Sequence, residues 1–188
     1  MKHLMILVFT FCTVSLFAQE VSENIERKGF VFGAGVGGGV ISISENGAGF
    51  GKAQGGISLP DLKLGWMVND RLAILATSPG MLYSLDDKDR SFEAIVPTVQ
   101  YWLKNKWWVN GGLGLGMDMP AFYQIKKVEN EDWNFGCAVS LSTGYEVLQK
   151  KNFALDLQTR LNMGRVGLGN DMHRDGVSFS VGVGINFY

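Results

Sequence analysis

The chain has 188 residues, enough for one domain, and its formal net charge of −1 leaves no basic excess. A nucleic-acid-binding protein normally carries such an excess on one face, so this class is excluded. Glycine is abundant, with 25 residues, but it follows no Gly-X-Y period, which excludes a collagen-like chain.

Residues 1–18 predict a secretory signal peptide that is cleaved after Ala18. A short basic start precedes an apolar stretch from Leu4 to Phe17, and Ala18 supplies the small residue that cleavage requires. The stretch is shorter than the ~20 residues of a membrane-spanning helix. Cys12 lies inside the stretch, away from the cleavage point, which disfavours a lipoprotein.

The expected mature domain, residues 19–188, keeps one cysteine, Cys137, and therefore forms no internal disulfide. Removal of Lys2 leaves 16 basic against 18 acidic residues, a net charge of −2. No later apolar run is long enough for a membrane helix. If this domain enters a membrane, it must do so as a closed barrel, because only helices and barrels pair all their backbone groups in lipid.

The N-terminal half predicts four strands, at residues 28–43, 52–67, 71–84 and 91–104. In the first of them, apolar side chains alternate mostly with glycine. A break at Pro60-Asp61 indicates a bulge or bend in the second. Pro79 and Pro97 blur the register of the third and fourth strands.

The C-terminal half shows its strands more clearly, at residues 106–118, 132–148, 152–165 and 174–188. In the third of these, Leu155 and Leu157 share one parity, whereas Asp156 and Gln158 share the other. One face is therefore apolar and one polar, with a period of two residues. A helix would not produce this pattern.

The connections between the predicted strands alternate in length. Three are tight, at residues 68–71, 104–106 and 149–152. Four are longer and polar, at residues 44–51, 85–90, 119–131 and 166–173. Short turns on one side and long loops on the other are typical of transmembrane barrels, whose turns face the periplasm. We therefore expect an all-β chain that forms an eight-stranded antiparallel up-and-down transmembrane β-barrel.

The two parities predict which face meets lipid. The polar parity is dominated by Gly, Ala, Ser and Asn, which suit the crowded interior of an eight-stranded barrel. The apolar parity fits hydrocarbon. Aromatic residues near both strand ends predict two girdles at the membrane interfaces. The predicted interface residues are Trp66, Tyr101, Trp102, Trp107, Trp108, Trp133, Tyr145 and Tyr188, and the loop-side girdle also includes Tyr83, Phe92, Phe122 and Tyr123.

On these features, residues 28–188 resemble the small outer-membrane β-barrel proteins of Gram-negative bacteria. The chain also closes on the segment Gly182-Val-Gly-Ile-Asn-Phe-Tyr188. The resemblance implies that this aromatic end is recognised by the outer-membrane barrel assembly machinery. The alternating apolar positions of the last strand end at Phe187 and not at Tyr188. This departs from the family pattern and indicates an interface position for Tyr188.

We expect a monomer in the outer membrane, and the resemblance implies a role in envelope integrity, surface adhesion or stress response. No motif is specific to one functional subfamily. The long loops are candidates for an extracellular ligand, because exposed loops on a rigid scaffold often carry binding. Two alternatives stay open at this point: a narrow pore for small solutes, and a soluble secreted barrel that binds a hydrophobic ligand inside.

Three local patterns have residues that could carry chemistry. The segment 33–38 matches G-x-G-x-x-G, but a dinucleotide site needs a helix next, and a strand follows. Asp171, His173 and Asp175 have the side chains of a divalent metal site, but they are weak candidates, because a solvated polar loop is the favoured explanation. His173 completes no nucleophile–base–orienter set with Ser178 or Ser180, so we expect no enzyme and no cofactor.

Five charged residues fall on the inward parity: Lys63, Asp118, Glu146, Asp156 and Arg160. Isolated buried charges are costly, so we expect these side chains to form an internal ion network. Our hypothesis places Arg160 at its centre, flanked by Asp156 and Glu146. An Arg160 that pointed into lipid would contradict the predicted register of the last three strands.

Overall fold

The computed structural model describes residues 25–47, 51–85, 88–123 and 133–188. The predicted signal peptide and most of the loop 119–131 lie outside these residues. Among the described residues, no helix has the length and hydropathy needed to span a membrane.

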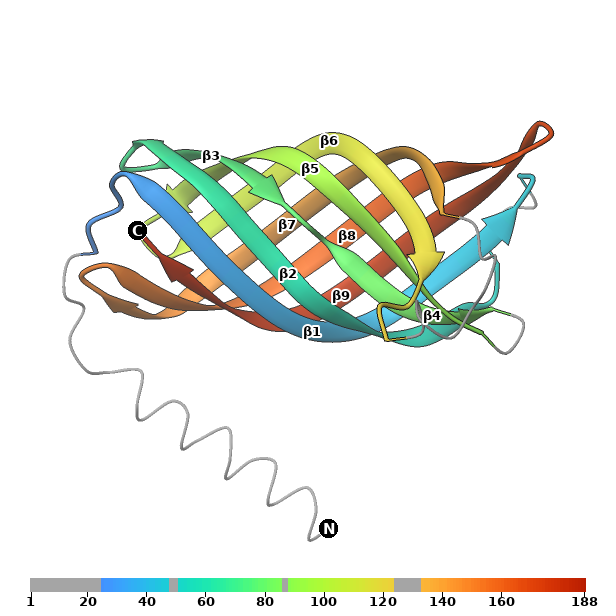
Figure 1. The fold of residues 1–188 in the computed structure, drawn as a ribbon. Helices are drawn as coiled ribbons and strands as arrows, with labels where there is room; N and C mark the ends of the chain where they lie inside the picture. Colours follow the sequence, from blue (N-terminus) through green and yellow to red (C-terminus); the bar gives the residue numbers. More distant parts are fainter. Residues whose placement is uncertain (1–24, 48–50, 86–87, 124–132) are drawn as a thin grey trace, which may run out of the picture.

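The described residues form one antiparallel sheet that closes on itself (Figure 1). Its strands are β1 Phe30–Glu45, β2 Ala53–Asn69, β3 Leu72–Thr77, β4 Gly80–Leu85, β5 Lys88–Lys104, β6 Trp107–Pro120, β7 Asn134–Lys150, β8 Phe153–Gly169 and β9 Met172–Phe187. Neighbours along the chain pair with each other, except β3 and β4, and β1 closes the ring by pairing with β9. Both β3 and β4 pair with β5, so the ring has eight positions, and the predicted all-β fold is confirmed.

The predicted third strand, 71–84, is divided into β3 and β4 by Ser78-Pro79. Pro79 has no N–H group to donate to the ladder. The interruption stays tied to its neighbours, because Ser78 N donates to Leu62 O and Ala94 N donates to Pro79 O, each at 2.9 Å. The predicted irregularity at Pro60-Asp61 is also present, as a register shift in the pairing of β1 with β2.

The predicted long loop at residues 166–173 is wrong. Strands β8 and β9 continue through most of it and are joined at Asn170-Asp171. Both residues have positive φ, 49° and 59°, as the two-residue type I′ turn of a hairpin requires. Polar composition suggested a loop, but here it marks strand ends that extend beyond the apolar band.

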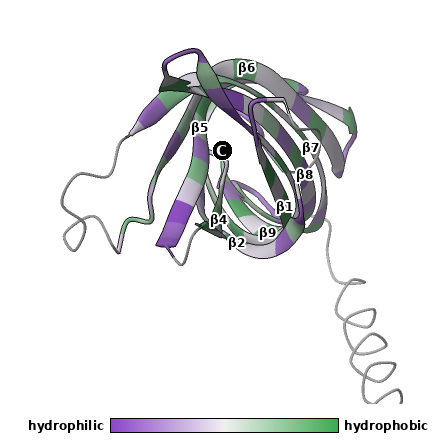
Figure 2. Ribbon diagram, turned by 90° about the vertical axis from the view of Figure 1, so that its right-hand side faces the viewer, coloured by the Kyte–Doolittle hydropathy of each residue, from purple (hydrophilic) through white to green (hydrophobic). Residues whose placement is uncertain are grey.

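The polarity of the barrel is reversed relative to a soluble protein. Large apolar side chains cover the outer wall, with Leu113 70 % and Trp66 59 % exposed, whereas charged and amide side chains are buried inside. Figure 2 views the ring from its loop end, with hydrophobic and hydrophilic residues alternating along the strands. Because successive side chains of a strand point to opposite faces, one sequence supplies both surfaces.

The interior is packed in layers. At the turn end, Trp102 and Trp108 pack with Val31, Met67, Ala73 and Leu75. At the loop end, Phe92 and Tyr83 pack with Ile41, Met81 and Val166. Polar side chains fill the space between these layers, among them Thr98, Gln100, Gln158 and Arg160.

Candidate functional site

The structure places the five predicted charges inside the barrel, all nearly inaccessible to solvent. It does not gather them into one network. They fall into a turn-end group around Glu146, a central group that includes Lys63, Asp156 and Arg160, and a loop-end group around Asp118.

The turn-end group is built on the carboxylate of Glu146, in β7. It accepts hydrogen bonds from Arg27 Nη2 at 2.6 Å, Trp102 Nε1 at 2.8 Å, Gln149 Nε2 at 2.6 Å and Tyr188 Oη at 2.9 Å. The Arg27 guanidinium also lies 4.8 Å from the centre of the Trp102 ring, a cation–π contact. These contacts close the turn-side mouth of the barrel.

Arg27 comes from the segment before β1 and was not among the predicted charges. Its Nη2 also donates to Asn105 O at 2.5 Å, and Glu26 N donates to Lys151 O at 2.9 Å. The segment therefore reaches across the mouth toward two turns. Its residues lie outside any alternating pattern, so the periodicity that revealed the other charges carried no signal here.

Tyr188 follows the last strand and packs beside Trp102, with ring centres 5.8 Å apart. Burial raises the pKa of its hydroxyl well above the usual value, and the Glu146 carboxylate adds to the effect. The hydroxyl therefore stays protonated and donates to Glu146.

The hypothesis that Arg160 pairs with Asp156 and Glu146 is wrong. Arg160 pairs with Asp61, from β2, and also donates to Gln158 Oε1 at 3.3 Å. Arg160 and Asp156 lie four residues apart on β8, roughly 13 Å along the strand at ~3.3 Å per residue. A partner across the narrow lumen is closer than one farther along the same strand.

The other two central charges use aromatic and amide partners. Asp156 Oδ2 accepts from Trp108 Nε1 at 3.1 Å and from Asn186 Nδ2 at 2.8 Å. Lys63 Nζ lies 4.0 Å from the centre of the Trp108 ring. Trp108 therefore lies between the Lys63 amine and the Asp156 carboxylate, and these two groups form no direct ion pair in the described residues.

The loop-end group surrounds Asp118, in β6. Its carboxylate accepts from Tyr83 Oη at 2.7 Å, from Arg90 Nε at 3.1 Å and from Arg174. Arg174 Nη2 also donates to Glu45 Oε1 at 2.6 Å. Two arginines and two carboxylates thus tie β1, β5, β6 and β9 together at this mouth.

The predicted interface aromatics divide into two sets. Five lie exposed on the outer wall: Trp66, Tyr101, Trp107, Trp133 and Tyr145. The prediction is wrong for Trp102 and Trp108, which are 1 % and 0 % exposed, and for Tyr188. It is also wrong for Tyr83 and Phe92 in the loop-end layer, whereas Phe122 and Tyr123 are exposed.

Parity explains the inward tryptophans. Trp102 has the parity of Thr98 and Gln100, and Trp108 has that of Asn110, all of them inward. Adjacent Trp107 and Trp108 cannot both face lipid in a strand. The parity of these residues therefore carries the signal, because proximity to a strand end does not determine which face a side chain takes.

The weak metal candidates do not converge. Asp175 lies on the outer wall, where Arg165 Nε and Nη2 donate to its carboxylate at 2.6 and 2.9 Å. His173 Nε2 is 3.7 Å from Asp175 Oδ2, and Asp171 is exposed in the hairpin turn. Within the described ranges, no three His, Cys, Asp or Glu side chains are grouped to hold a metal.

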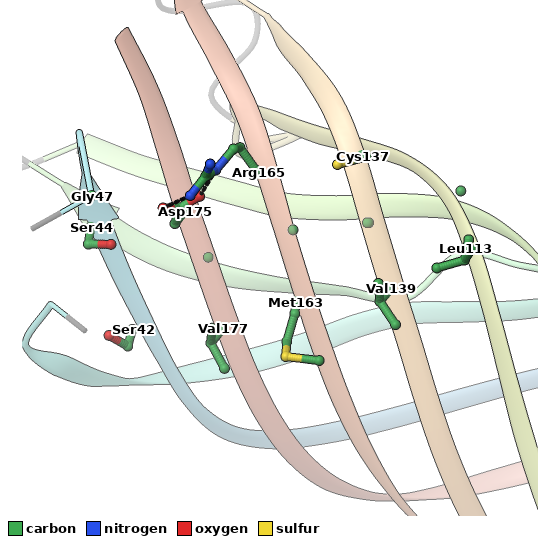
Figure 3. Close-up of a pocket in the computed structure, with 14 residues that line it drawn as sticks. Ser42, Ser44, Gly47, Leu113, Cys137, Val139, Met163, Arg165, Asp175 and Val177 are labelled. Atoms are coloured by element: carbon green, nitrogen blue, oxygen red, sulfur yellow. Dashed lines mark hydrogen bonds and ion pairs between the residues drawn. The ribbon is translucent and has the colours of Figure 1, made fainter. Parts of the chain in front are cut away.

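A groove of about 650 Å³ crosses the outer wall from β1 over β9, β8 and β7 to β6 (Figure 3). Its floor is a row of small cross-strand neighbours, Gly176, Gly164, Ala138 and Gly114. A Cβ atom on Gly164 or Gly176 would point inside, toward the Phe92 ring. The outer wall therefore exposes only backbone along this row.

Two rows of outward side chains border the groove. The row nearer the loops contains Ser44, Asp175, Arg165 and Cys137, which are neighbours across four strands. The row nearer the turns contains Ser42, Val177, Met163, Val139 and Leu113. One side of the groove is therefore polar and the other mainly apolar.

No protein-family model matches the chain, and no curated protein matches it. Among solved structures, the Neisserial surface protein A, NspA, is 16 % identical, covers 84 % of this chain and 96 % of its own, and has a TM-score of 0.58. Ail, the attachment invasion locus protein of Yersinia pestis, is 13 % identical, covers 85 % and 99 %, and has a TM-score of 0.53. The chain thus has the fold of the small outer-membrane β-barrel proteins.

Proposed function

We propose that this chain is a non-enzymatic outer-membrane β-barrel protein, exported through a cleaved signal peptide, with a structural or surface-interaction role in the envelope. The observation that carries the proposal is the reversed polarity of the barrel. Leucine, valine and phenylalanine side chains cover the outer wall, whereas Lys63, Asp156 and Arg160 are buried inside. In water this arrangement would expose a large apolar surface, and in lipid it is the stable one.

The reversed polarity argues against the soluble secreted barrel. That alternative requires a lumen lined by large apolar side chains around a hydrophobic ligand. The middle of this lumen is lined by Thr98, Gln100, Gln158 and other polar residues. The apolar layers at the two ends are filled by their own side chains.

The packed lumen also argues against the narrow pore. Trp102 and Trp108 close the turn end, and the group around Asp118 closes the loop end. The cavity beside Arg160 and Asp61 has a volume of about 10 Å³, room for about one water molecule. A solute would have to displace several buried hydrogen-bonded side chains, each at substantial cost.

A surface role implies that a ligand or partner binds at the loop end of the barrel. Ail has been solved with the heparin analogue sucrose octasulfate, so a barrel of this fold can bind a ligand. We propose that the loops of this chain contact an extracellular ligand or partner, because the strands supply a rigid frame beneath them.

Fractionation with heat-modifiable gel mobility tests the membrane proposal. We expect the protein in the outer-membrane fraction, with different mobilities in detergent before and after boiling. Recovery in the soluble periplasmic fraction, with no mobility shift, would contradict it.

Planar-bilayer recordings separate the surface role from the pore. We expect no conductance steps from the folded barrel. Reproducible steps from the folded barrel that become larger in a Trp102→Ala variant would require a conduction path past this side chain and would favour the pore.

A further inference from the structure

The outer-wall groove has the same order of polarity as a membrane lipid. Strand β9 runs from the loop end to the turn end, so Asp175 lies nearer the loops than Val177. The polar row is thus outermost, and the apolar row lies toward the centre of the wall. A lipid in the loop-side leaflet likewise has its polar group outermost and its hydrocarbon chains toward the membrane centre.

Arg165 supplies hydrogen-bond donors at the polar edge. Its Nε and Nη2 face Asp175, and its side chain is 59 % exposed. No hydrogen bond from Nη1 to another described residue is present. A guanidinium held on one edge by a carboxylate can donate from its other edge to a phosphate oxygen.

The floor of the groove suits a flexible hydrocarbon chain. The outward side of Gly164 and Gly176 is bare backbone, so a chain can approach closely. Met163 and Val139 offer apolar contacts along one side. A volume of about 650 Å³ lies within the ~300–1,000 Å³ of small-molecule sites.

We propose that this groove binds one acyl chain of a phosphate-bearing lipid from the loop-side leaflet, with the phosphate hydrogen-bonded to Arg165. The inference rests on the proposed function, because it requires the wall to face hydrocarbon. A second copy of the barrel is the less suitable occupant. Symmetric contact here would take two Arg165–Asp175 pairs out of water, with a desolvation penalty for each.

Native mass spectrometry of the full protein, purified in mild detergent, tests the proposal. The probes are phosphatidylglycerol and a diacylglycerol with the same chains. We expect one phosphatidylglycerol to be retained, at least tenfold more strongly than diacylglycerol. Equal retention of both probes would overturn the role of Arg165.

Two variants and a matched control locate the site. Val139→Phe fills the groove from its apolar side and should reduce phosphatidylglycerol retention at least tenfold. Val99→Phe makes the same change on the outer wall of β5, away from the groove, and should leave retention unchanged. Arg165→Gln should leave chain binding in place and abolish the preference for phosphatidylglycerol.

The outcomes separate this inference from the proposed function. Each variant is first checked for membrane recovery and heat-modifiable mobility. If the wild-type barrel is membrane-resident and Val139→Phe retains as much lipid as Val99→Phe, the inference alone fails. If Val139→Phe does not fold, the Arg165→Gln variant provides the test. An unchanged preference for phosphatidylglycerol over diacylglycerol in this variant would overturn the inference. Oxidative cross-linking through Cys137 to a covalent dimer would overturn the inference in favour of a second copy.

Discussion

At the scale of single residues, buried groups are stabilised through shared partners. Glu146 receives four side-chain donors, from Arg27, Trp102, Gln149 and Tyr188. A carboxylate with several hydrogen bonds and a paired cation tolerates burial, whereas a lone charge would not. The donors come from the residues that flank β1 and β9 and from two strands, β5 and β7, so one side chain organises the turn-side mouth.

Replacement of Glu146 by Gln should therefore be strongly destabilising. It leaves the Arg27 guanidinium buried without its carboxylate, a loss of about 3–5 kcal/mol in the free energy of unfolding. Urea unfolding of the barrel in lipid vesicles measures it. Glu26→Gln, an exposed carboxylate at the same end, is the control and should change stability by less than ~0.5 kcal/mol.

Adjacent tryptophans 107 and 108 offer a second residue-scale test. Trp107 is exposed on the outer wall, whereas Trp108 is buried against Asp156. In vesicles of brominated lipid, we expect Trp107→Phe to remove a quenched component of the fluorescence and Trp108→Phe to remove an unquenched one. The opposite assignment would show that the register of β6 is shifted by one residue.

At the scale of elements, backbone chemistry explains where the strands end. Pro79 divides one ring position between β3 and β4, and Asn170-Asp171 turns β8 into β9. Positive φ is tolerated by Asn and Asp, and it is costly for β-branched side chains. The hairpin therefore depends on residue types that composition alone assigned to a loop.

Asp171→Val should destabilise this hairpin by roughly 1–2 kcal/mol, because valine is strained at positive φ. Asp171→Gly, which has no such strain, should be neutral or slightly stabilising. Amide hydrogen exchange in β8 and β9 reports the local effect. Equal protection in the two variants would argue against the positive-φ turn.

Much of the fold was predictable, because alternation is a local property of the sequence. The ring of eight, the apolar outer wall and the inward charges all follow from a period of two residues. The pairing of those charges was not predictable. The Arg160–Asp61 contact crosses the lumen, and which residues face each other there depends on strand stagger around the closed ring. Arg27 lies outside any strand, so no periodic signal marked it.

At the scale of the whole molecule, closure makes the barrel possible. Strands β1 and β9 pair along nearly their full length, from Phe32 opposite Phe187 to Glu45 opposite Arg174. Closure through β2, β3 and β5 leaves no sheet edge in the turn-side part of the ring, whereas in the described residues no ladder joins β4 to the loop-side part of β2. The packed interior then fills the ring, so function is directed to the loops and the outer wall.

Arg27 and Tyr188 both donate hydrogen bonds to Glu146, and this shared contact shows how the strands could be reconnected. The guanidinium of Arg27 lies 5.7 Å from the Tyr188 ring, so the beginning of β1 and the end of β9 are close in space. A short glycine-serine linker should join them, with new termini opened at Lys151-Asn152, an exposed turn at the same end. Such a circular permutant should insert and show the same heat-modifiable mobility. The architecture would then depend on which strands are neighbours in the ring, and not on the order in which they are synthesised.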